Sequence, residues 1–70
     1  MQKNKNNEIL YVIVNRNGDY LVTFERKDPF RPTYVFGFGI EATAIKLNNL
    51  ETAERWASIA GGKVKKYQYK

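Results

Sequence analysis

The 70-residue chain contains no cysteine and no histidine. Without cysteine, a disulfide framework and a thiolate zinc site are excluded. Without histidine, the commonest general base and the commonest metal ligand are missing. No run of about 18 apolar residues occurs, so we expect no membrane span. The polar segment from Met1 to Asn7 has no apolar stretch typical of a signal peptide, and cytoplasmic location is the default expectation.

The charged and aromatic residues are the positive features of this composition. Lys and Arg number 12 against 7 Asp and Glu, which gives a formal charge of +5, and aromatics make up 14% of the chain. This balance favours anionic partners. A chain this short forms one domain. We expect a disordered tail over residues 1–7 and a single domain over residues 8–70.

A β-hairpin is predicted near the N-terminus. Ile9–Val14 is a continuous run of β-branched, aliphatic and aromatic residues, and Asp19–Glu25 alternates in the manner of a strand. Asn17 and Gly18 between them favour a two-residue type I′ turn. With these two residues as the loop, we expect three cross-strand pairs, which are Val14 with Leu21, Ile13 with Val22 and Tyr11 with Phe24.

The remaining pattern predicts a third strand, a helix and a fourth strand. Arg26–Pro32 is a loop, Thr33–Ile40 is a strand, and Glu41–Leu47 is expected to be irregular or extended. Asn48 is expected to cap a helix with Glu51 three residues later, and Gly61 to end it in a left-handed conformation. Lys63–Tyr69 alternates again, with Val64 set apart from Lys65, Tyr67 and Tyr69. The predicted fold is therefore α+β, a small antiparallel sheet in the order β-β-β-α-β with one helix packed on one face.

Both faces of the predicted sheet are rich in apolar residues, and one helix covers only one of them. We expect the helix to lie over the bare side formed by Val35, Gly37 and Gly39, with Trp56 and Leu50 filling the gap. The aromatic side is then left uncovered, and Tyr11, Phe24, Phe36 and Phe38 on it form an interface. The inverse arrangement, with the aromatics as core, is the alternative. In either case a homo-oligomer is expected, since a small chain gains missing core in that way.

Basic residues interleave with aromatic ones in the last predicted strand. Lysines suit phosphates and tyrosines suit stacked bases, so the pattern favours binding of nucleic acid or a nucleotide. The expected ligand-binding residues are Lys63, Lys65, Lys66, Tyr67 and Tyr69, with Arg26 and Arg31 clamping from the proline loop and Tyr20 and Tyr34 as further stacking residues. The alternative reading is an edge strand that lysines protect against aggregation.

Catalytic chemistry has little support in the sequence. Ser58 and the threonines have no histidine partner, and Glu51 and Glu54 lie on the exposed side of the predicted helix. We therefore expect no enzymatic activity, no cofactor and no metal site.

Two resemblances follow from the motif order. The pattern of Gly18, Tyr20, Val22 and Phe24, followed by an aromatic strand and by the motif that runs from Leu47 to Trp56, resembles the arm-binding domain of phage tyrosine integrases, over about residues 15–57. That family reads DNA by inserting a three-stranded sheet into the major groove. This chain departs from it in having a fourth strand and no catalytic domain.

The whole chain from Ile9 resembles small accessory proteins of phages of low-GC Gram-positive bacteria. Glu51–Ala57 and Gly61–Val64 carry that pattern, and the Lys/Asn-rich start fits it. The resemblance implies a non-enzymatic protein that tunes host functions or counters host defence, inside a bacterial host.

The leading functional hypothesis is a non-enzymatic phage or mobile-element protein that binds an anionic partner through a basic and aromatic sheet surface. The partner is nucleic acid or a nucleotide-type signal. One alternative is an inhibitor of a host defence protein that binds through the aromatic face. The other is a sequence-reading DNA-binding domain like that of the integrases.

Overall fold

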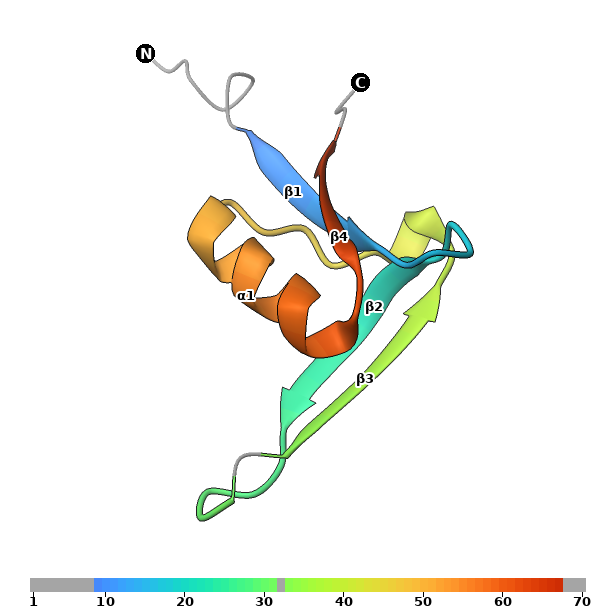
Figure 1. The fold of residues 1–70 in the computed structure, drawn as a ribbon. Coiled ribbons are helices and arrows are strands. Elements are labelled where there is room, and N and C mark those ends of the chain that lie inside the picture. Colours follow the sequence, from blue (N-terminus) through green and yellow to red (C-terminus); the bar gives the residue numbers. More distant parts are fainter. Residues whose placement is uncertain (1–8, 32, 68–70) are drawn as a thin grey trace.

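A four-stranded antiparallel sheet with one α-helix forms the body of the protein. The computed structural model describes residues 9–31 and 33–67, so the expected tail over residues 1–7 lies outside the described residues. The sheet has the strand order β3-β2-β1-β4, and α1 packs on it (Figure 1). The predicted α+β fold is thereby confirmed. The elements are β1 (Leu10–Val14), β2 (Tyr20–Arg26), β3 (Tyr34–Gly39), the 3-10 helix η2 (Glu41–Thr43), α1 (Leu50–Ala60) and β4 (Lys63–Tyr67).

The turn between β1 and β2 is one residue longer than predicted. Asn15 N–H donates to the Asp19 carbonyl at 2.9 Å, and Gly18 N–H donates to the Asn15 carbonyl at 3.0 Å. Three residues therefore form the loop. Gly18 ends it with a positive φ of 88°, and among the described residues only glycines have positive φ. The Asn15 side chain accepts hydrogen bonds from the N–H groups of Asn17 and Asp19. These two hydrogen bonds stabilise the three-residue loop that ends at Gly18.

The longer loop changes the register of the hairpin. Val14 faces Tyr20, whereas the two-residue turn predicted that it faces Leu21. Because side chains alternate along a strand, a shift of one residue exchanges the faces of Tyr20 and Leu21. Leu21 joins Ile13 in the core, where each is 1% exposed, and Tyr20 lies with Val14 on the opposite face.

A β-bulge in β2 then brings Phe24 onto the same side as Leu21. Leu21 pairs with Phe38 and Phe24 pairs with Phe36, and the register shifts between Leu21 and Thr23. Without the extra residue, positions 21 and 24 would point to opposite faces. The bulge therefore places the aromatic residues of β2 and β3 beside the aliphatic core.

The helix covers this aromatic side, so the expectation that it lies over Val35, Gly37 and Gly39 was wrong. Trp56 stacks on Phe24 with ring centroids 4.2 Å apart and an interplanar angle of 11°. The core cluster beneath the helix consists of buried Ile13, Leu21 and Ala57 with partly buried residues packed around them, which are Phe24, Phe38, Ile45, Leu47, Trp56, Ala60 and Val64. Val12, Ala44 and Ala53 are buried as well. The physical reason is apolar area, since aromatic rings offer a helix far more area to bury than a strip of glycines does.

The ends of α1 differ slightly from the prediction. Asn49, not Asn48, is the N-cap, and its side chain accepts a hydrogen bond from Thr52 N–H at 2.9 Å. Gly61 ends the helix at φ 82°, as predicted. Leu50 at the first turn is 44% exposed and does not fill the space under the helix.

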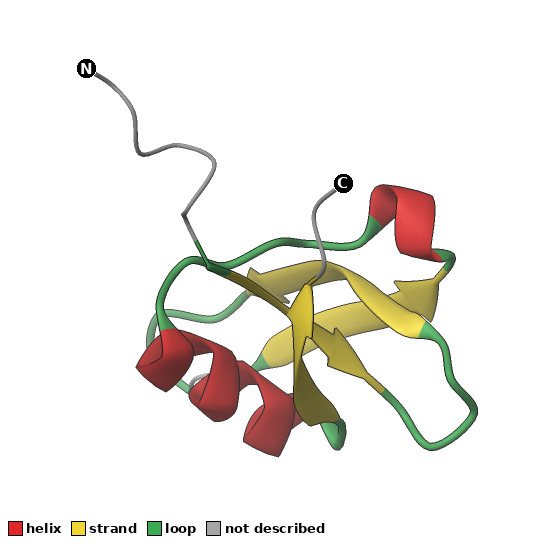
Figure 2. Cartoon of the chain, turned by 90° about the horizontal axis from the view of Figure 1, so that it is seen from above, coloured by secondary structure: helices red, strands yellow, loops and turns green. Residues whose placement is uncertain are grey.

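The segment after η2 completes the sheet between the diverging ends of β1 and β2. Tyr11 and Leu47 exchange two backbone hydrogen bonds of 2.7 and 2.9 Å, and Ile45 N–H donates to the Leu21 carbonyl at 2.9 Å. The predicted irregular or extended path is thus a short 3-10 helix followed by an extended segment. As Figure 2 shows, η2 and α1 lie on opposite sides of the sheet.

Candidate functional site

The side chains of β4 alternate between the two faces of the sheet. Val64 pairs with Ile13 and packs on the core beneath α1. Lys63, Lys65 and Tyr67 pair with residues of β1 on the opposite face. The predicted separation of Val64 from Lys65 and Tyr67 is confirmed, and β4 presents Lys63 and Lys65 on the face opposite the helix.

Two tyrosines on this open face each have a lysine ammonium group over the ring. Lys65 Nζ lies 5.8 Å from the ring centroid of Tyr20, and Lys46 Nζ lies 4.9 Å from that of Tyr67. Lys46 Nζ also donates to the Ala44 carbonyl at 3.4 Å. An ammonium over an aromatic ring is attracted by the electron-rich face. The two pairs hold lysines and tyrosines together in one strip although three separate parts of the chain supply them.

Two hollows lie along this strip, one toward each end of β4. The smaller, of about 100 Å³, is lined by Val12, Tyr20, Glu41, Lys65, Lys66 and Tyr67. The larger, of about 460 Å³, is lined by Val14, Asn15, Arg16, Gly61, Gly62 and Lys63. We call the surface formed by Arg16, Tyr20, Lys46, Lys63, Lys65 and Tyr67 the β4 track.

The positive charge of the β4 track is not neutralised within the described part of the chain. The one ion pair among residues 9–31 and 33–67 joins Lys27 to Glu25, at 3.2 Å, on β2 and the loop after it. Glu41 is the one carboxylate that lines either hollow. Lys63 and Lys65 are exposed, so their ammonium groups are available to an anion.

Lys46 and Arg16 were not among the residues expected from the sequence. Lys46 lies in the segment that the sequence left irregular, and its position beside Tyr67 depends on the pairing of Leu47 with Tyr11. Arg16 belongs to the turn whose length was mispredicted. For Lys46, the sequence signal was a lysine within an expected edge segment. That signal does not indicate which strand the segment pairs with.

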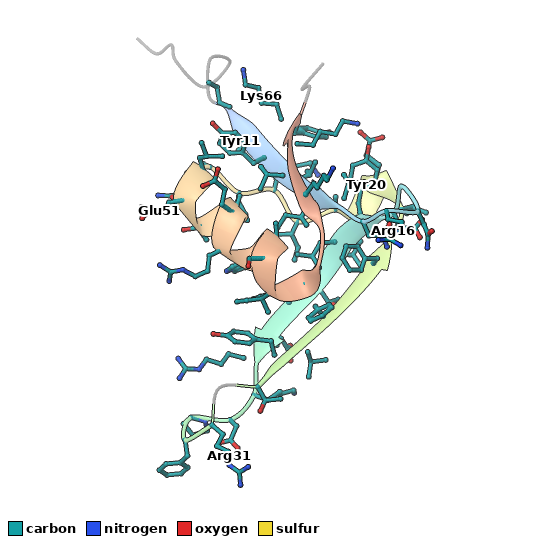
Figure 3. The ribbon with its side chains drawn as sticks, viewed as in Figure 1. Tyr11, Arg16, Tyr20, Arg31, Glu51 and Lys66 are labelled. Carbon is teal, nitrogen blue, oxygen red and sulfur yellow. The ribbon has the colours of Figure 1, made fainter. Side chains whose placement is uncertain are left out.

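The expected clamp from the proline loop lies far from the β4 track. Arg31 is near the tip of the β2–β3 hairpin, at the opposite end of the molecule from Lys66 (Figure 3). Arg26 pairs with Tyr34 at the same end of the sheet. Tyr34 contacts Phe24, with centroids 5.4 Å apart, on the helix side. The structure therefore does not bring Arg26, Arg31 and Tyr34 together with Lys65, and Tyr69 lies outside the described residues.

Lys66 and the expected interface residues are also divided between environments. Lys66 pairs with Tyr11 and belongs to the helix-side set of β4, although it lines the smaller hollow. Phe24 and Phe38 pack against the core, whereas Phe36 is 38% exposed at the outer strand of the sheet. Most of the aromatic set is thus occupied by contacts within the chain.

Within the described ranges, no group of three or more Asp or Glu side chains is placed to hold a metal ion. No helix of the described part is long and apolar enough to cross a bilayer. Comparisons with family models, with curated proteins and with solved structures found no match to this chain.

Proposed function

We propose that this protein binds single-stranded nucleic acid along the β4 track. The observation that carries the proposal is the alternation of exposed lysines without carboxylate partners and tyrosine rings on the open face of the sheet. Lysines neutralise phosphates, and tyrosine rings stack on bases without regard to sequence. The proposed ligand lies across β4 and β1 with its phosphates at Lys63 and Lys65 and its bases on Tyr20 and Tyr67.

The spacing of the lysines suits an extended strand. Residues two apart on one face of a β-strand are about 6.6–6.8 Å apart, which is comparable with the separation of neighbouring phosphates in an extended single strand. Lys63 and Lys65 are therefore placed to contact successive phosphates. Arg16, beside Lys63 in the larger hollow, extends the positive surface by one more group.

The shape of the surface favours a polymer over a free nucleotide. Small-molecule sites usually enclose about 300–1,000 Å³. The hollow beside Tyr20 and Tyr67 measures about 100 Å³, too small to enclose a nucleotide. The larger hollow has no aromatic side chain in its lining. A base that stacks on the ring of Tyr20 while the backbone continues along β4 fits both observations.

The lysine–tyrosine pairs of the free protein prepare this surface for exchange. Each ammonium group lies over a ring, at 4.9 Å for Lys46 on Tyr67 and 5.8 Å for Lys65 on Tyr20. When a single strand binds, the ammonium group moves to a phosphate and the ring face becomes available to a base. A charge-assisted contact with phosphate is stronger than an exposed cation–π contact of about 0.5–1 kcal/mol, so the exchange favours binding.

Fluorescence anisotropy with a labelled thymidine oligonucleotide tests the proposal. If Arg16, Lys46, Lys63 and Lys65 neutralise about four phosphates, log K should fall with log salt at a slope of about −3. Lys65→Gln should weaken binding and reduce the steepness of the slope by about 0.7. Tyr20→Ala should weaken binding by about 1–3 kcal/mol, and Tyr20→Phe should bind like the wild type, since it keeps the stacking ring.

Arg55→Gln is the matched control. Arg55 is an exposed cation of α1, which packs on the other side of the sheet, so its removal changes the net charge by the same amount as Lys65→Gln. The proposal requires that the two variants differ. Equal losses, or no detectable binding at low salt, would refute it.

The expectations that came from the resemblances stand apart from this geometry. A role in countering host defence, binding of a host defence protein and integrase-like reading of duplex DNA remain hypotheses. If a double-stranded oligonucleotide of specific sequence binds more tightly than the single strand, the integrase-like alternative is favoured instead.

A further inference from the structure

The two edges of the sheet differ sharply in charge. β4, at one edge, carries three lysines in the five residues Lys63–Tyr67. β3, at the other edge, has the sequence YVFGFG and carries no charge. Natural proteins protect edge strands from pairing with other chains by charges, particularly lysines, and by prolines and bulges. β4 has this protection and β3 does not.

The backbone of β3 leaves a regular row of hydrogen-bonding groups on its outer side. Lys27 N–H donates to the Thr33 carbonyl at 2.7 Å, which identifies this pair as a hydrogen-bonded pair of the antiparallel ladder. Hydrogen-bonded pairs alternate along such a ladder, so Val35 and Gly37 direct their backbone groups toward β2. The N–H and C=O groups of Tyr34, Phe36 and Phe38 point away from β2. None of the described elements lies along that outer side (Figure 1).

Apolar side chains at this edge are exposed in the single chain. Val35 is 50% exposed and Phe36 is 38% exposed. The ring of Phe36 contacts Phe24 on its inner side, with centroids 6.3 Å apart, and continues the aromatic row outward. A strand added beside β3 would cover both residues.

We propose that β3 is the dimer interface and that it pairs in antiparallel fashion with β3 of a second copy of this chain. Phe36 of one copy lies opposite Phe36 of the other across the two-fold axis, and Tyr34 lies opposite Phe38. Val35 then faces Gly37 of the second copy, where no side chain opposes it. An antiparallel strand pair is self-complementary, as a two-fold interface must be.

The lack of charge on β3 favours this edge of the sheet for pairing with a second copy. Each chain carries a formal charge of +5, so two copies repel one another wherever lysines meet. The stretch from Thr33 to Ile40 contains no charged residue, so pairing through β3 opposes no like charges directly. The product is a continuous eight-stranded sheet with a β4 track at each outer edge. This inference does not depend on nucleic-acid binding, because β3 and β4 lie at opposite edges of the sheet.

The oligomeric state as a function of concentration tests the interface. A single pair of six-residue strands buries less area than the lower end of the standard range, about 1,200 Å². We therefore expect a dimer dissociation constant on the order of 100 μM. Sedimentation equilibrium on the full chain should show the mass rising from 8.2 kDa toward twice that value as the concentration is raised. Phe36→Lys places two like charges opposite each other at the axis and should weaken dimerisation at least tenfold.

Ile40→Lys is the matched control, because Ile40 is 69% exposed but lies beyond the end of β3. It adds the same charge and should leave the dimerisation constant within about twofold of the wild type. Circular dichroism checks that both variants are folded. If Phe36→Lys does not fold, amide exchange on the wild type decides the question. Tyr34, Phe36 and Phe38 should become protected as concentration rises, while Val35 and Gly37 are protected throughout. A chain that stays monomeric at about 1 mM, or a dimer without this alternation, overturns the proposal.

Discussion

The structure requires glycine at both position 61 and position 62, but for different reasons. Substituting each glycine in turn distinguishes these reasons. A Cβ atom on Gly62 would lie 2.8 Å from Ile13 Cγ2 and 2.9 Å from the backbone oxygen of Val14. A Cβ atom on Gly61 would meet nothing within 4 Å, but Gly61 has φ of 82°. Gly62 is therefore required for space, where the chain leaving α1 crosses β1, and Gly61 for its left-handed backbone.

The magnitude of the Gly62→Ala effect follows from what the new methyl group meets. Ile13 is 1% exposed and packed within the core cluster, and the Val14 oxygen belongs to the backbone of β1. Overpacking of this kind costs about 1–3 kcal/mol. A domain of this length has a total stability of roughly 3.5–10 kcal/mol, at 0.05–0.15 kcal/mol per residue. With about 4–8 °C lost per kcal/mol, Gly62→Ala should lower Tm by about 4–24 °C.

Asparagine at each position distinguishes the two causes. Asn tolerates the left-handed conformation better than Ala does, so Gly61→Asn should be more stable than Gly61→Ala. At Gly62 the larger side chain gives no relief, and Gly62→Asn should be no more stable than Gly62→Ala. Thermal unfolding followed by circular dichroism measures all four variants. If Gly62→Ala melts within about 2 °C of the wild type, the close approach of this crossing to β1 is refuted.

Two further predictions concern α1. Trp56→Ala removes the ring stacked on Phe24 at 4.2 Å and should lower the free energy of unfolding by about 3–5 kcal/mol, as measured by urea denaturation. A loss below about 1 kcal/mol would contradict the placement of the helix over the aromatic side. Asn49→Ala removes the acceptor for Thr52 N–H and should cost about 1 kcal/mol, whereas Asn49→Asp keeps an acceptor and should be close to neutral. Amide exchange at Thr52 reports this cap directly, and unchanged protection in Asn49→Ala would show that another residue caps α1.

Local patterns were sufficient to predict most elements of the fold. The four strands and the helix follow from runs of β-branched and aromatic residues, from helical spacing and from the glycine after α1. The alternation in the last strand also predicted correctly that Val64 lies apart from Lys65 and Tyr67. These predictions succeed because they depend on neighbours in the sequence, whose conformational preferences act over a few residues.

The register and the faces required contacts that local patterns do not contain. The Asn15 side chain accepts two hydrogen bonds in the turn and selects a three-residue loop, which moves Leu21 into the core. One extra residue in β2 then reverses the alternation before Phe24. The first shift exchanges the faces of Tyr20 and Leu21, and the second places Phe24 on the same side as Leu21, so two small local differences decided which residues of β2 the helix covers.

The sequence by itself determined that this is a small basic α+β domain whose last strand presents lysines and a tyrosine on one face. The tertiary structure decided which other residues lie beside these lysines and this tyrosine. Lys46 reaches Tyr67 because Leu47 pairs with Tyr11, and Tyr20 meets Lys65 because the turn before it is one residue longer. Arg31 is kept from the same surface by the length of the β2–β3 hairpin (Figure 3). Arg26 pairs with Tyr34 near the same end of that hairpin. The physical reason is that composition and alternation are properties of single segments, whereas a binding surface depends on the register between segments distant in the chain.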